Sequence, residues 1–399
     1  MFDFDVKELP NIKFSHSMLL EYYNEVKANF QHLKWTPDNR VSEHNVKKLY
    51  SWAIQSNLKD VSKPCPPYNI KHDNEVIGSF DNLTDLVFGF GQLVVDCFPD
   101  VRQTVISVHP STTEIKQHID NDEFFKIHIP IETNSKSCFV FGDKKYNLEV
   151  GKAYFINTKN KHGTINNGNT DRAHLIFKIP HCHAEKILNE EFILDPNYYD
   201  FDIKEINYDF NFGNLLSYYN ELEQNFSNMK WQVPDMSTIP ENKRPPGNEN
   251  ASGIHGYGIQ SNLKDIEQPC PAYNNKSISK EEKIRSYTNK TKMFYGFAEK
   301  LFNDFDNVEE MVITGHPPKS GIGQHIDSYT HFRIHFPIIA NNESHFIYGD
   351  KKYVLNTKKA YIVNTARHHG TFNNGKTDRV HLLFKVPLSK VNNILKKYL

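Results

Sequence analysis

The sequence has few cysteines, and their spacing matches no common disulfide or zinc pattern. Only five occur in 399 residues, widely spread and without a Cys-x-x-Cys pair: Cys65, Cys97, Cys138, Cys182 and Cys270. A disulfide-stabilised fold needs paired cysteines and a thiolate zinc site needs closely spaced ones, so neither is expected to organise the fold. We therefore expect reduced thiols and a cytoplasmic protein.

The sequence also lacks a surplus of charge and a long apolar segment. Lys and Arg total 47 against 48 for Asp and Glu, so no excess of positive charge is available for phosphates and nucleic acid is not an expected partner. The most apolar run, LVFGFGQLVV from Leu86 to Val95, is about half the length of a membrane-spanning helix. The first residues, MFDFDVKELPN, are acidic where an export signal is basic. We expect neither membrane insertion nor export.

The sequence does contain a long internal repeat. The segment IQSNLKDVSKPCPPYN recurs as IQSNLKDIEQPCPAYN, and the offset is 207 positions from His109 and His316 through to Pro180 and Pro387. A period close to 200 is the size of a whole domain. The repeat predicts two tandem domains, at residues 1–184 and 210–399, joined by an acidic, turn-rich linker at 185–209. It also allows the two copies to pair within the chain.

The second copy has about nine extra residues between Trp231 and Tyr257, within MSTIPENKRPPGNENASG. Their proline, glycine and asparagine content predicts a loop, which is either a lid over the second site or a tolerated surface insertion. The repeated aromatic residues near this region, Trp35 with Trp231 and Tyr68 with Tyr273, either pack in the core or line a substrate pocket.

Each copy is predicted to contain helices in its first part and β-strands in its second part. Apolar residues at helical spacing over Leu19–Phe30 and Leu83–Cys97 predict helices. The block that follows has short alternating runs, separated by turn signals such as GDKKY and NNGNTD: VISV, FFKIHIPI, SCFVF, KAYFIN and AHLIFKI. This pattern is typical of an antiparallel sandwich or barrel. We expect a mainly β fold with flanking helices.

Histidine and aspartate recur in this block at spacings that suit a metal ion. His118 and Asp120 are two residues apart in an extended segment, so their side chains point the same way. His162 follows 44 residues later, and the second copy repeats the spacing with His325, Asp327 and His369. Two imidazoles and one carboxylate on one side of a metal leave positions open for substrate and oxygen, as Fe(II) chemistry requires. The spacing therefore predicts a metal site in each copy.

An arginine follows the last histidine of each set by ten residues. Arg172 begins RAHLIFKIP and Arg379 begins RVHLLFKVP, strands with apolar residues on both faces. A guanidinium in such surroundings is costly to bury unless a carboxylate meets it. We expect each arginine to bind an acidic group.

Together these residues resemble a known family. His-x-Asp, then Lys/Arg-x-His on the next strand, then His-Gly, then the arginine resemble the aspartyl/asparaginyl β-hydroxylase and proline cis-hydroxylase family of Fe(II)/2-oxoglutarate-dependent dioxygenases. The resemblance covers about residues 103–180 and 310–387. It implies a double-stranded β-helix, or jelly roll, in each copy. It also implies Fe(II), 2-oxoglutarate and O2 as cofactors, with iron held by His118, Asp120, His162, His325, Asp327 and His369.

The resemblance also implies roles for the neighbouring polar side chains. Arg172 and Arg379 would bind the distal carboxylate of 2-oxoglutarate as a two-pronged fork, helped by the hydroxyl groups of Ser107 and Thr314. Four further residues would face the other carboxylate of 2-oxoglutarate beside the metal: Lys126, His128, Arg333 and His335.

Two departures from the family pattern bear on activity. Lys126 stands where the family and the second copy have arginine, which replaces a bidentate contact by a point charge. Asp120 and Asp327 stand where the β-hydroxylase branch often has glycine, which places both copies nearer to the proline hydroxylase branch. A carboxylate ligand favours hydroxylation over halogenation, because a halide needs that coordination position.

The implied activity is hydroxylation of an unactivated carbon of an amino acid, free or within a peptide, of the Pro, Asp or Asn type. Two alternatives stay open. One half is catalytic and the other is a degenerate domain that docks substrate, or the chain is a non-catalytic cupin-like ligand-binding protein. A cupin metal site usually contains His-x-His and a Glu, and this alternative leaves the two arginines without a function.

Overall fold

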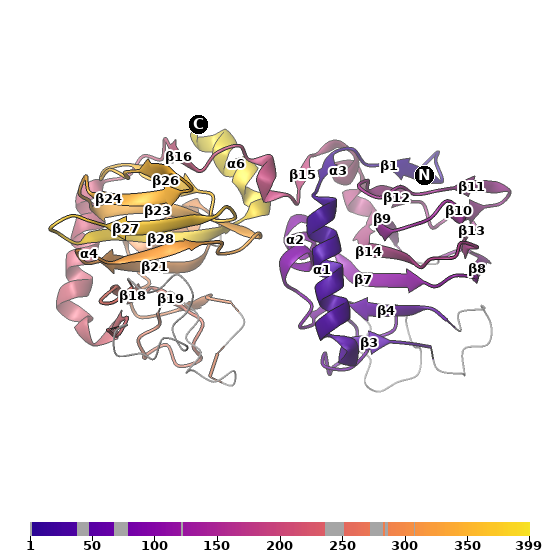
Figure 1. Cartoon of the computed structure of the whole chain (residues 1–399), viewed down its shortest axis with the longest axis horizontal. Helices are drawn as coiled ribbons and strands as arrows, with labels where there is room; N and C mark the ends of the chain where they lie inside the picture. The colour runs from indigo at the N-terminus through magenta and orange to yellow at the C-terminus, as the bar shows by residue number, and fades with distance from the viewer. Residues whose placement is uncertain are drawn as a thin grey trace. The chain divides into compact units, whose positions relative to one another are not determined.

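The chain folds into two compact units, Met1–Tyr198 and Tyr199–Leu399 (Figure 1). The computed structural model describes residues 2–37, 48–67, 79–120, 123–235, 251–271, 282–283, 286–306 and 308–399. Most of the predicted loop between Trp231 and Tyr257 lies outside these residues, as do Tyr68 and Tyr273.

Two antiparallel sheets form the first unit. The larger has the strand order β1-β12-β9-β14-β7-β4-β3, with strands Val6–Glu8 (β1), Lys34–Trp35 (β3), Tyr50–Ala53 (β4), Arg102–His109 (β7), Phe124–Glu132 (β9), Tyr154–Ile156 (β12) and Arg172–Pro180 (β14). The smaller has the order β11-β10-β13-β8, with strands Thr113–His118 (β8), Ser137–Phe141 (β10), Lys144–Tyr146 (β11) and His162–Asn166 (β13). Short pairs join Ile12–Lys13 (β2) to Phe192–Ile193 (β15) and Gln55–Ser56 (β5) to Asn82–Leu83 (β6).

The second unit repeats this arrangement. Its larger sheet has the order β16-β26-β23-β28-β21-β18-β17, with strands Ile203–Ile206 (β16), Lys230–Gln232 (β17), His255–Gly258 (β18), Glu309–His316 (β21), His331–Ile339 (β23), Ala360–Val363 (β26) and Arg379–Pro387 (β28). Its smaller sheet has the order β22-β27-β24-β25, with strands Gly321–His325 (β22), Ser344–Tyr348 (β24), Lys351–Tyr353 (β25) and His369–Asn373 (β27). A short pair joins Gln260–Ser261 (β19) to Asn289–Lys290 (β20).

Helices pack against one face of each larger sheet. In the first unit α1 contacts both α2 and β9, and in the second α4 contacts α5 and β23 while α6 contacts β23 and β28 (Figure 1). The helices are His16–Asn29 (α1), Gly89–Cys97 (α2), Ala184–Asn189 (α3), Phe212–Asn225 (α4), Phe297–Asp304 (α5) and Leu388–Tyr398 (α6). Single turns of 3-10 helix occur at Gln31–Leu33 (η1), His181–His183 (η2), Pro196–Tyr198 (η3) and Ser227–Met229 (η4).

Matching N-caps begin the first long helix of each unit. Ser15 caps α1 by accepting a hydrogen bond from the backbone N–H of Met18, and Asn211 caps α4 by accepting one from Asn214. These short polar side chains satisfy N–H groups that have no partner in the first helical turn. The repeat thus extends to the way in which the helices begin.

The alternating pattern of β14 places two kinds of side chain on opposite faces. Leu175 and Phe177 are fully buried on the helix side, where the Phe177 ring lies 4.7 Å from that of Phe98, just after α2. Arg172 and Ile176 face the other way and line a cavity. The larger sheet therefore separates an apolar core on its helix side from the cavity on its other side.

The predicted mainly β fold with two tandem jelly-roll domains is confirmed. The runs expected to be strands form β7, β9, β10, β12 and β14. The second predicted helix was too long, because Leu83 lies in β6 and α2 begins only at Gly89. The Thr84 hydroxyl explains the difference, since it donates to the carbonyl groups of Ala53 and Ile54 and ties this segment to β4.

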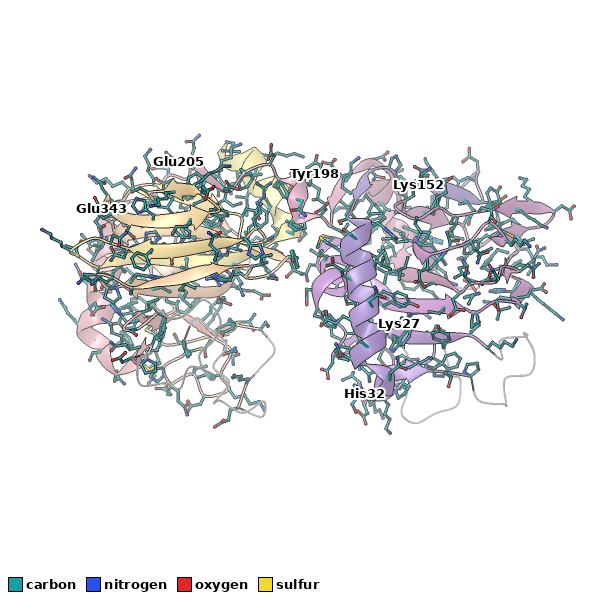
Figure 2. All side chains as sticks on the ribbon, viewed as in Figure 1. Lys27, His32, Lys152, Tyr198, Glu205 and Glu343 are labelled. Atoms are coloured by element: carbon teal, nitrogen blue, oxygen red, sulfur yellow. The ribbon has the colours of Figure 1, made fainter. Side chains whose placement is uncertain are left out.

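The segment expected to be a linker, residues 185–209, is built into both units. Its first part contains most of α3 and also β15, which pairs with β2 of the first unit. Its second part contains β16, which pairs with β26 of the second unit. The division falls after Tyr198, and Glu205 lies beyond it in β16 (Figure 2).

Two other expectations bear on the class of protein. All five cysteines are free thiols. Among the described residues, no helix is both long enough and apolar enough to cross a membrane.

Candidate functional site

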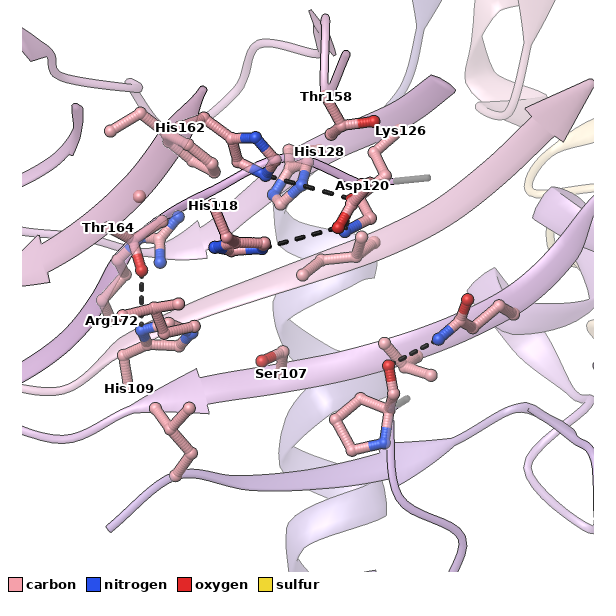
Figure 3. Close-up of a pocket in the computed structure, with 18 of the residues that line it drawn as sticks. Ser107, His109, His118, Asp120, Lys126, His128, Thr158, His162, Thr164 and Arg172 are labelled. Atoms are coloured by element: carbon pink, nitrogen blue, oxygen red, sulfur yellow. Dashed lines mark hydrogen bonds and ion pairs between the residues drawn. The ribbon is translucent and has the colours of Figure 1, made fainter. Parts of the chain in front are cut away.

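A cavity of about 390 Å³ in the first unit contains every site residue predicted for that copy (Figure 3). The larger sheet supplies four of them and the smaller sheet two, while Asp120 lies two residues after the end of β8. They are Ser107 on β7, Lys126 and His128 on β9, Arg172 on β14, His118 on β8, His162 on β13, and Asp120. The sandwich therefore brings together residues that are up to 65 positions apart in the sequence.

Strand pairing positions the two predicted histidine ligands. His118 and His162 are direct partners in the β8–β13 ladder, and their ring centres lie 4.6 Å apart. Gly163 permits this close approach, because a Cβ atom there would lie 2.5 Å from the carbonyl oxygen of Ile115. The backbone N–H of Asp120 donates to Thr158 (3.1 Å), which fixes the carboxylate beside the two rings.

Hydrogen bonds fix which ring nitrogen of each histidine can bind a metal. Nδ1 of His118 lies 2.9 Å from the carbonyl oxygen of Lys116, and Nδ1 of His162 lies 2.9 Å from that of Asn160. A carbonyl oxygen only accepts, so Nδ1 carries a hydrogen in both rings, and Nε2 is the nitrogen whose lone pair is available to a metal when the ring is neutral. Both Nε2 atoms face Asp120, at 3.5 Å from Oδ1 for His118 and 3.9 Å from Oδ2 for His162.

Neighbouring groups keep Asp120 ionised and His162 neutral. Burial alone would raise the pKa of the Asp120 carboxyl, but the hydrogen bond from His118 and the Lys126 ammonium at 2.6 Å hold it well below its usual range. Burial, with Lys126 nearby, lowers the pKa of His162 to about 4. The hydrogen bond to Asp120 raises the pKa of His118. At neutral pH the cluster offers one carboxylate and a neutral imidazole as metal ligands.

The second unit contains the matching cluster of His325, Asp327 and His369. Nε2 of His325 lies 3.0 Å from Asp327 Oδ1, and Nε2 of His369 lies 3.9 Å from Asp327 Oδ2. Their Nδ1 atoms also face carbonyl oxygens, those of Gly323 at 2.7 Å and Arg367 at 3.0 Å. The same tautomers, and the same direction of the lone pairs, follow.

Both clusters suit a divalent metal ion. In each, one donor atom from every residue lies within 4.8 Å of the others. Two imidazoles and a carboxylate on one side of an ion form the facial arrangement of non-haem Fe(II) sites. Carbonyl partners behind the imidazoles orient them as outer-shell partners do in metal sites. The donor set therefore fits iron.

Arg172 is buried in the cavity, and none of the described carboxylates pairs with it. Its side chain donates to His174 at 3.2 Å and lies 4.8 Å from the Phe139 ring, and the residue is 3% exposed. Arg379 repeats this arrangement with His381 and Phe346. Within the described chain, no Asp or Glu forms an ion pair with either arginine. Burial lowers the pKa of each to about 9, so both stay charged at neutral pH.

His128 also has an unused polar atom. In the described structure its buried Nε2 has no hydrogen-bond partner, and the same holds for Nε2 of His335. Burial, with Arg172 or Arg379 nearby, holds the pKa of both histidines well below the ordinary value, so both rings are neutral. An unpaired guanidinium and an unsatisfied imidazole nitrogen in one cavity fit a carboxylate-bearing ligand such as 2-oxoglutarate.

The second unit places its other predicted residues at matching register positions. His335 is on β23, Arg379 on β28 and Thr314 on β21. Arg333 differs from Lys126, because it contacts two carboxylates, Asp327 Oδ2 at 2.8 Å and Glu310 Oε1 at 2.9 Å.

Several residues near the sites were not among the predictions. Gln103 and Lys178 line the first cavity, and Glu310 and Lys385 take their places in the second unit. The sequence contains a signal for this difference. Gln103 lies six residues before His109 and Glu310 lies six residues before His316, so an alignment of the two copies places a neutral side chain opposite a charged one. Four buried histidines also lie near the arginines: His109 and His174 in the first unit, and His316 and His381 in the second.

Similarity to solved structures is low throughout. A prolyl-4-hydroxylase of Pseudomonas putida is 6% identical over 45% of this chain and 93% of its own, with a TM-score of 0.27. An oxidoreductase of the 2OG-Fe(II) oxygenase family from Burkholderia pseudomallei is 10% identical over 44% of this chain and 84% of its own, also at 0.27. A cupin 2 conserved barrel domain protein of Salinispora arenicola is 8% identical over 38% and 93%, at 0.20. These values carry no argument about activity.

Comparison with curated proteins yields no match. Comparison with protein families gives a specific result. The aspartyl/asparaginyl beta-hydroxylase family matches twice, at residues 79–182 and 276–387, which together are more than half of the chain. Each match contains one complete His–Asp–His cluster and its arginine. The resemblance noted from the sequence is confirmed, and the chain belongs to the aspartyl/asparaginyl β-hydroxylase family.

Proposed function

We propose that the chain is an Fe(II)/2-oxoglutarate-dependent dioxygenase that hydroxylates an unactivated carbon of an amino acid, free or within a peptide, of the Pro, Asp or Asn type. One observation carries the proposal. A His–Asp–His cluster with its Nε2 lone pairs facing inward shares a cavity with a buried arginine that no described carboxylate pairs with. A metal alone would explain the first feature, and only an additional acidic ligand explains the second.

Three residues in each domain would hold the iron. They are His118, Asp120 and His162 in the first and His325, Asp327 and His369 in the second. With 2-oxoglutarate and O2, the bound iron would supply the oxidising power for hydroxylation, and 2-oxoglutarate would leave as succinate and CO2. The carboxylate ligand favours hydroxylation over halogenation, as expected from the sequence.

The remaining cavity residues would hold 2-oxoglutarate. Arg172 would grip its distal carboxylate as a fork, with the Ser107 hydroxyl as a further donor, and Arg379 and Thr314 would do the same in the second domain. Neutral His128 would donate from Nε2 to the carboxylate beside the metal, since its Nδ1 already lies 3.3 Å from His174. Lys126 would keep Asp120 ionised, which suits a metal ligand.

A second candidate is a hybrid in which only the first domain turns over. Arg333 favours it, because that side chain already contacts Asp327 and Glu310 and so has fewer donors left for a ligand. In the first domain Lys126 has Gln103 nearby in place of a second carboxylate. A cupin-like ligand-binding protein remains the non-catalytic alternative.

Anaerobic titration tests the proposal. Purified protein is mixed with Fe(II) and 2-oxoglutarate under nitrogen, and a visible charge-transfer band is expected from their chelate. Turnover is then followed as succinate release during a screen of free amino acids and short peptides, with a mass gain of one oxygen identifying the substrate. Absence of the band in folded protein would contradict the enzyme assignment and favour the cupin-like alternative.

Single substitutions show which domain turns over. Asp120→Ala and Asp327→Ala each remove one carboxylate ligand, while Asp143→Ala and Asp350→Ala remove exposed carboxylates at equivalent hairpins of the smaller sheets. If both domains work, each ligand variant loses about half of the succinate release and the controls lose none. Complete loss in Asp120→Ala with none in Asp327→Ala would identify the hybrid.

A further inference from the structure

One turn in each domain contacts two of the three candidate metal ligands. In the first domain this ligand turn is residues 157–160, between β12 and β13. The carbonyl oxygen of Thr158 accepts from the backbone N–H of Asp120 at 3.1 Å. The carbonyl oxygen of Asn160 lies 2.9 Å from Nδ1 of His162. The position of the turn therefore sets where the carboxylate and one imidazole lie.

The second domain repeats the ligand turn at residues 364–367, between β26 and β27. The carbonyl oxygen of Thr365 accepts from the backbone N–H of Asp327 at 3.1 Å, and that of Arg367 lies 3.0 Å from Nδ1 of His369. All of these positions are 207 residues beyond their counterparts. The two copies have thus kept the turn together with the ligands that it contacts.

The segment just before the edge strand β1 holds the first ligand turn. Phe4 and Asp5 form this segment, and three hydrogen bonds join them to the turn. The backbone N–H of Asn157 donates to the Asp5 carbonyl oxygen at 2.9 Å, and its side-chain amide donates to that of Phe4 at 3.0 Å. The side-chain amide of Asn160 donates to Asp5 Oδ1 at 2.7 Å. Both ends of the turn are thus fixed by residues from the start of the domain.

Phe201 and Asp202 hold the second ligand turn in the same way, just before the edge strand β16. Asn364 donates from its backbone N–H to the Asp202 carbonyl oxygen at 2.9 Å and from its side-chain amide to Phe201 at 3.2 Å. Arg367 donates to Asp202 Oδ1 at 3.0 Å, where the first domain uses the amide of Asn160. The contact to the carboxylate is kept although its donor has changed.

A hairpin of the smaller sheet holds the other oxygen of each carboxylate. Asp5 Oδ2 accepts from the Tyr146 hydroxyl at 3.0 Å, and Asp202 Oδ2 accepts from the Tyr353 hydroxyl at 2.8 Å. Burial alone would raise the pKa of both carboxyl groups, but the hydrogen bonds from the hairpin and the turn hold it below the usual range. Each ionised carboxylate therefore links the ligand turn to the smaller sheet.

These segments lie outside both parts of the chain that match the family. We infer that Asp5 and Asp202 are positioning residues for the metal clusters, each holding the ligand turn of its own domain and so setting the metal affinity of that domain. Outer partners of metal ligands typically contribute about 10- to 100-fold to affinity, and we expect the lower value because these aspartates act through the turn. The inference rests on the proposed function for the metal sites, but the binding that it predicts requires neither 2-oxoglutarate nor turnover.

Anaerobic titration of the full chain with Co(II) tests the inference, because the visible absorption of bound Co(II) reports both affinity and coordination geometry. Each site is measured in a chain whose other cluster lacks its carboxylate. Asp327→Ala leaves only the first cluster complete, and Asp120→Ala leaves only the second. Asp5→Ala should then weaken Co(II) binding at the first site about tenfold, and Asp202→Ala should do the same at the second.

Two controls separate positioning from a loss of fold. Asp5→Ala is also measured at the second site and Asp202→Ala at the first, where Co(II) affinity should not change. Tyr146→Phe and Tyr353→Phe remove a hydrogen bond to the same carboxylates from the hairpin and leave the turn untouched. These two variants should change Co(II) affinity by less than about twofold.

A conservative exchange in the second ligand turn provides a rescue. Arg367→Ala removes the side-chain donor to Asp202, whereas Arg367→Asn supplies the amide that the first domain uses at this position. Both variants remove the same charge, so the comparison isolates the hydrogen bond. Arg367→Asn should bind Co(II) about fivefold tighter than Arg367→Ala, a recovery that misfolding cannot produce.

Four results would overturn the inference: unchanged affinity at the site of the same domain in either aspartate variant, an equal loss at both sites, a loss in Tyr146→Phe as large as in Asp5→Ala, or equal affinity of the two Arg367 variants. A protein that binds Co(II) at both sites but fails in one of these ways retains the proposed function, with its ligands held by the strand ladders alone.

Two further outcomes concern the proposed function itself. A protein that binds no Co(II) has no metal sites, and both the inference and the proposed function then fail. Co(II) binding with the expected losses, but without the chelate band of Fe(II) and 2-oxoglutarate, retains the positioning role of the two aspartates and overturns the proposed function.

Discussion

The first and second domains hold the carboxylates of their candidate metal clusters with different cations. Lys126 contacts Asp120 as a single point charge, whereas Arg333 contacts Asp327 with one side of its fork and Glu310 with the other. The histidine clusters themselves differ little, with ring separations of 4.6 and 4.7 Å. The ligand geometry has stayed the same after duplication while the charges around it have diverged.

This difference separates two properties of the site, the positions of the candidate ligand atoms and the charge of the side chains beside them. Metal binding depends on ligand atoms whose positions are fixed by the strand ladders, so any change there is felt directly. The charge next to these residues also acts on whatever enters the cavity, and it differs between the domains although the spacing of the histidine rings does not. The two domains are therefore natural controls for each other.

The largest expected effect concerns a feature that the domains share, the buried arginine. Arg172→Met or Arg379→Met should lower the affinity of that domain for 2-oxoglutarate about 100-fold, because two charge-assisted hydrogen bonds worth about 1.5 kcal/mol each are lost. The ligand-free protein should become more stable, since an apolar side chain replaces a guanidinium that pairs with none of the described carboxylates. Calorimetric titration and thermal unfolding measure the two effects.

A ligand-binding arginine is distinguished from a structural one when its loss lowers the affinity for 2-oxoglutarate and raises the stability of the ligand-free protein. Arg102→Met, an exposed position at the start of β7, is the matched control and should change neither quantity much. A loss of stability in ligand-free Arg172→Met would contradict the assigned role, even if 2-oxoglutarate affinity also fell.

A smaller effect should appear when the cations of the two domains are exchanged. Arg333→Lys keeps the charge but reaches only one of Asp327 and Glu310, so the chain should lose about 1–2 kcal/mol of unfolding free energy. Lys126→Arg should change stability by less than about 0.5 kcal/mol, because Gln103 provides no second carboxylate. Chemical denaturation of both variants measures the difference. Equal effects would show that Glu310 contributes nothing to holding Arg333.

The smallest effect concerns acid sensitivity. Burial lowers the pKa of His331 to about 3, whereas the first domain has Phe124 at this position. The unfolded chain takes up a proton on this histidine near pH 6.5 and the folded chain does not, so stability present above pH 6.5 is lost as the pH falls towards 3. His331→Phe should remove this loss, by up to about 1.4 kcal/mol per pH unit.

Denaturation at pH 7.5 and pH 5.5 measures this change as the difference between wild type and His331→Phe. The variant should gain stability relative to wild type at the lower pH. A difference that is the same at both pH values would show that His331 is protonated equally in the folded and unfolded chains.

Much of the architecture follows from the sequence because it depends on local spacing and on the repeat. Alternation places Arg172 and Leu175 on opposite faces of one strand wherever that strand lies, and the 207-residue offset identifies two copies. His118 and Asp120 share a face for the same reason. In this way the sequence predicts the family, the fold class and the grouping of the six histidine and aspartate residues. The role of these residues as iron ligands stays a prediction.

The tertiary structure decided which distant residues share each site. The bulges at Gln103 and Glu310 depend on pairing between strands about 70 residues apart, and nothing local in the sequence indicates a positive φ there. The pairing of Lys126 with Lys178 and of Arg333 with Lys385 is likewise set by ladder register. Side-chain period is a local property of a strand, whereas register is fixed by packing across the sheet. The sequence alone therefore predicted the histidine and aspartate clusters, and only the fold showed that a charge differs beside them.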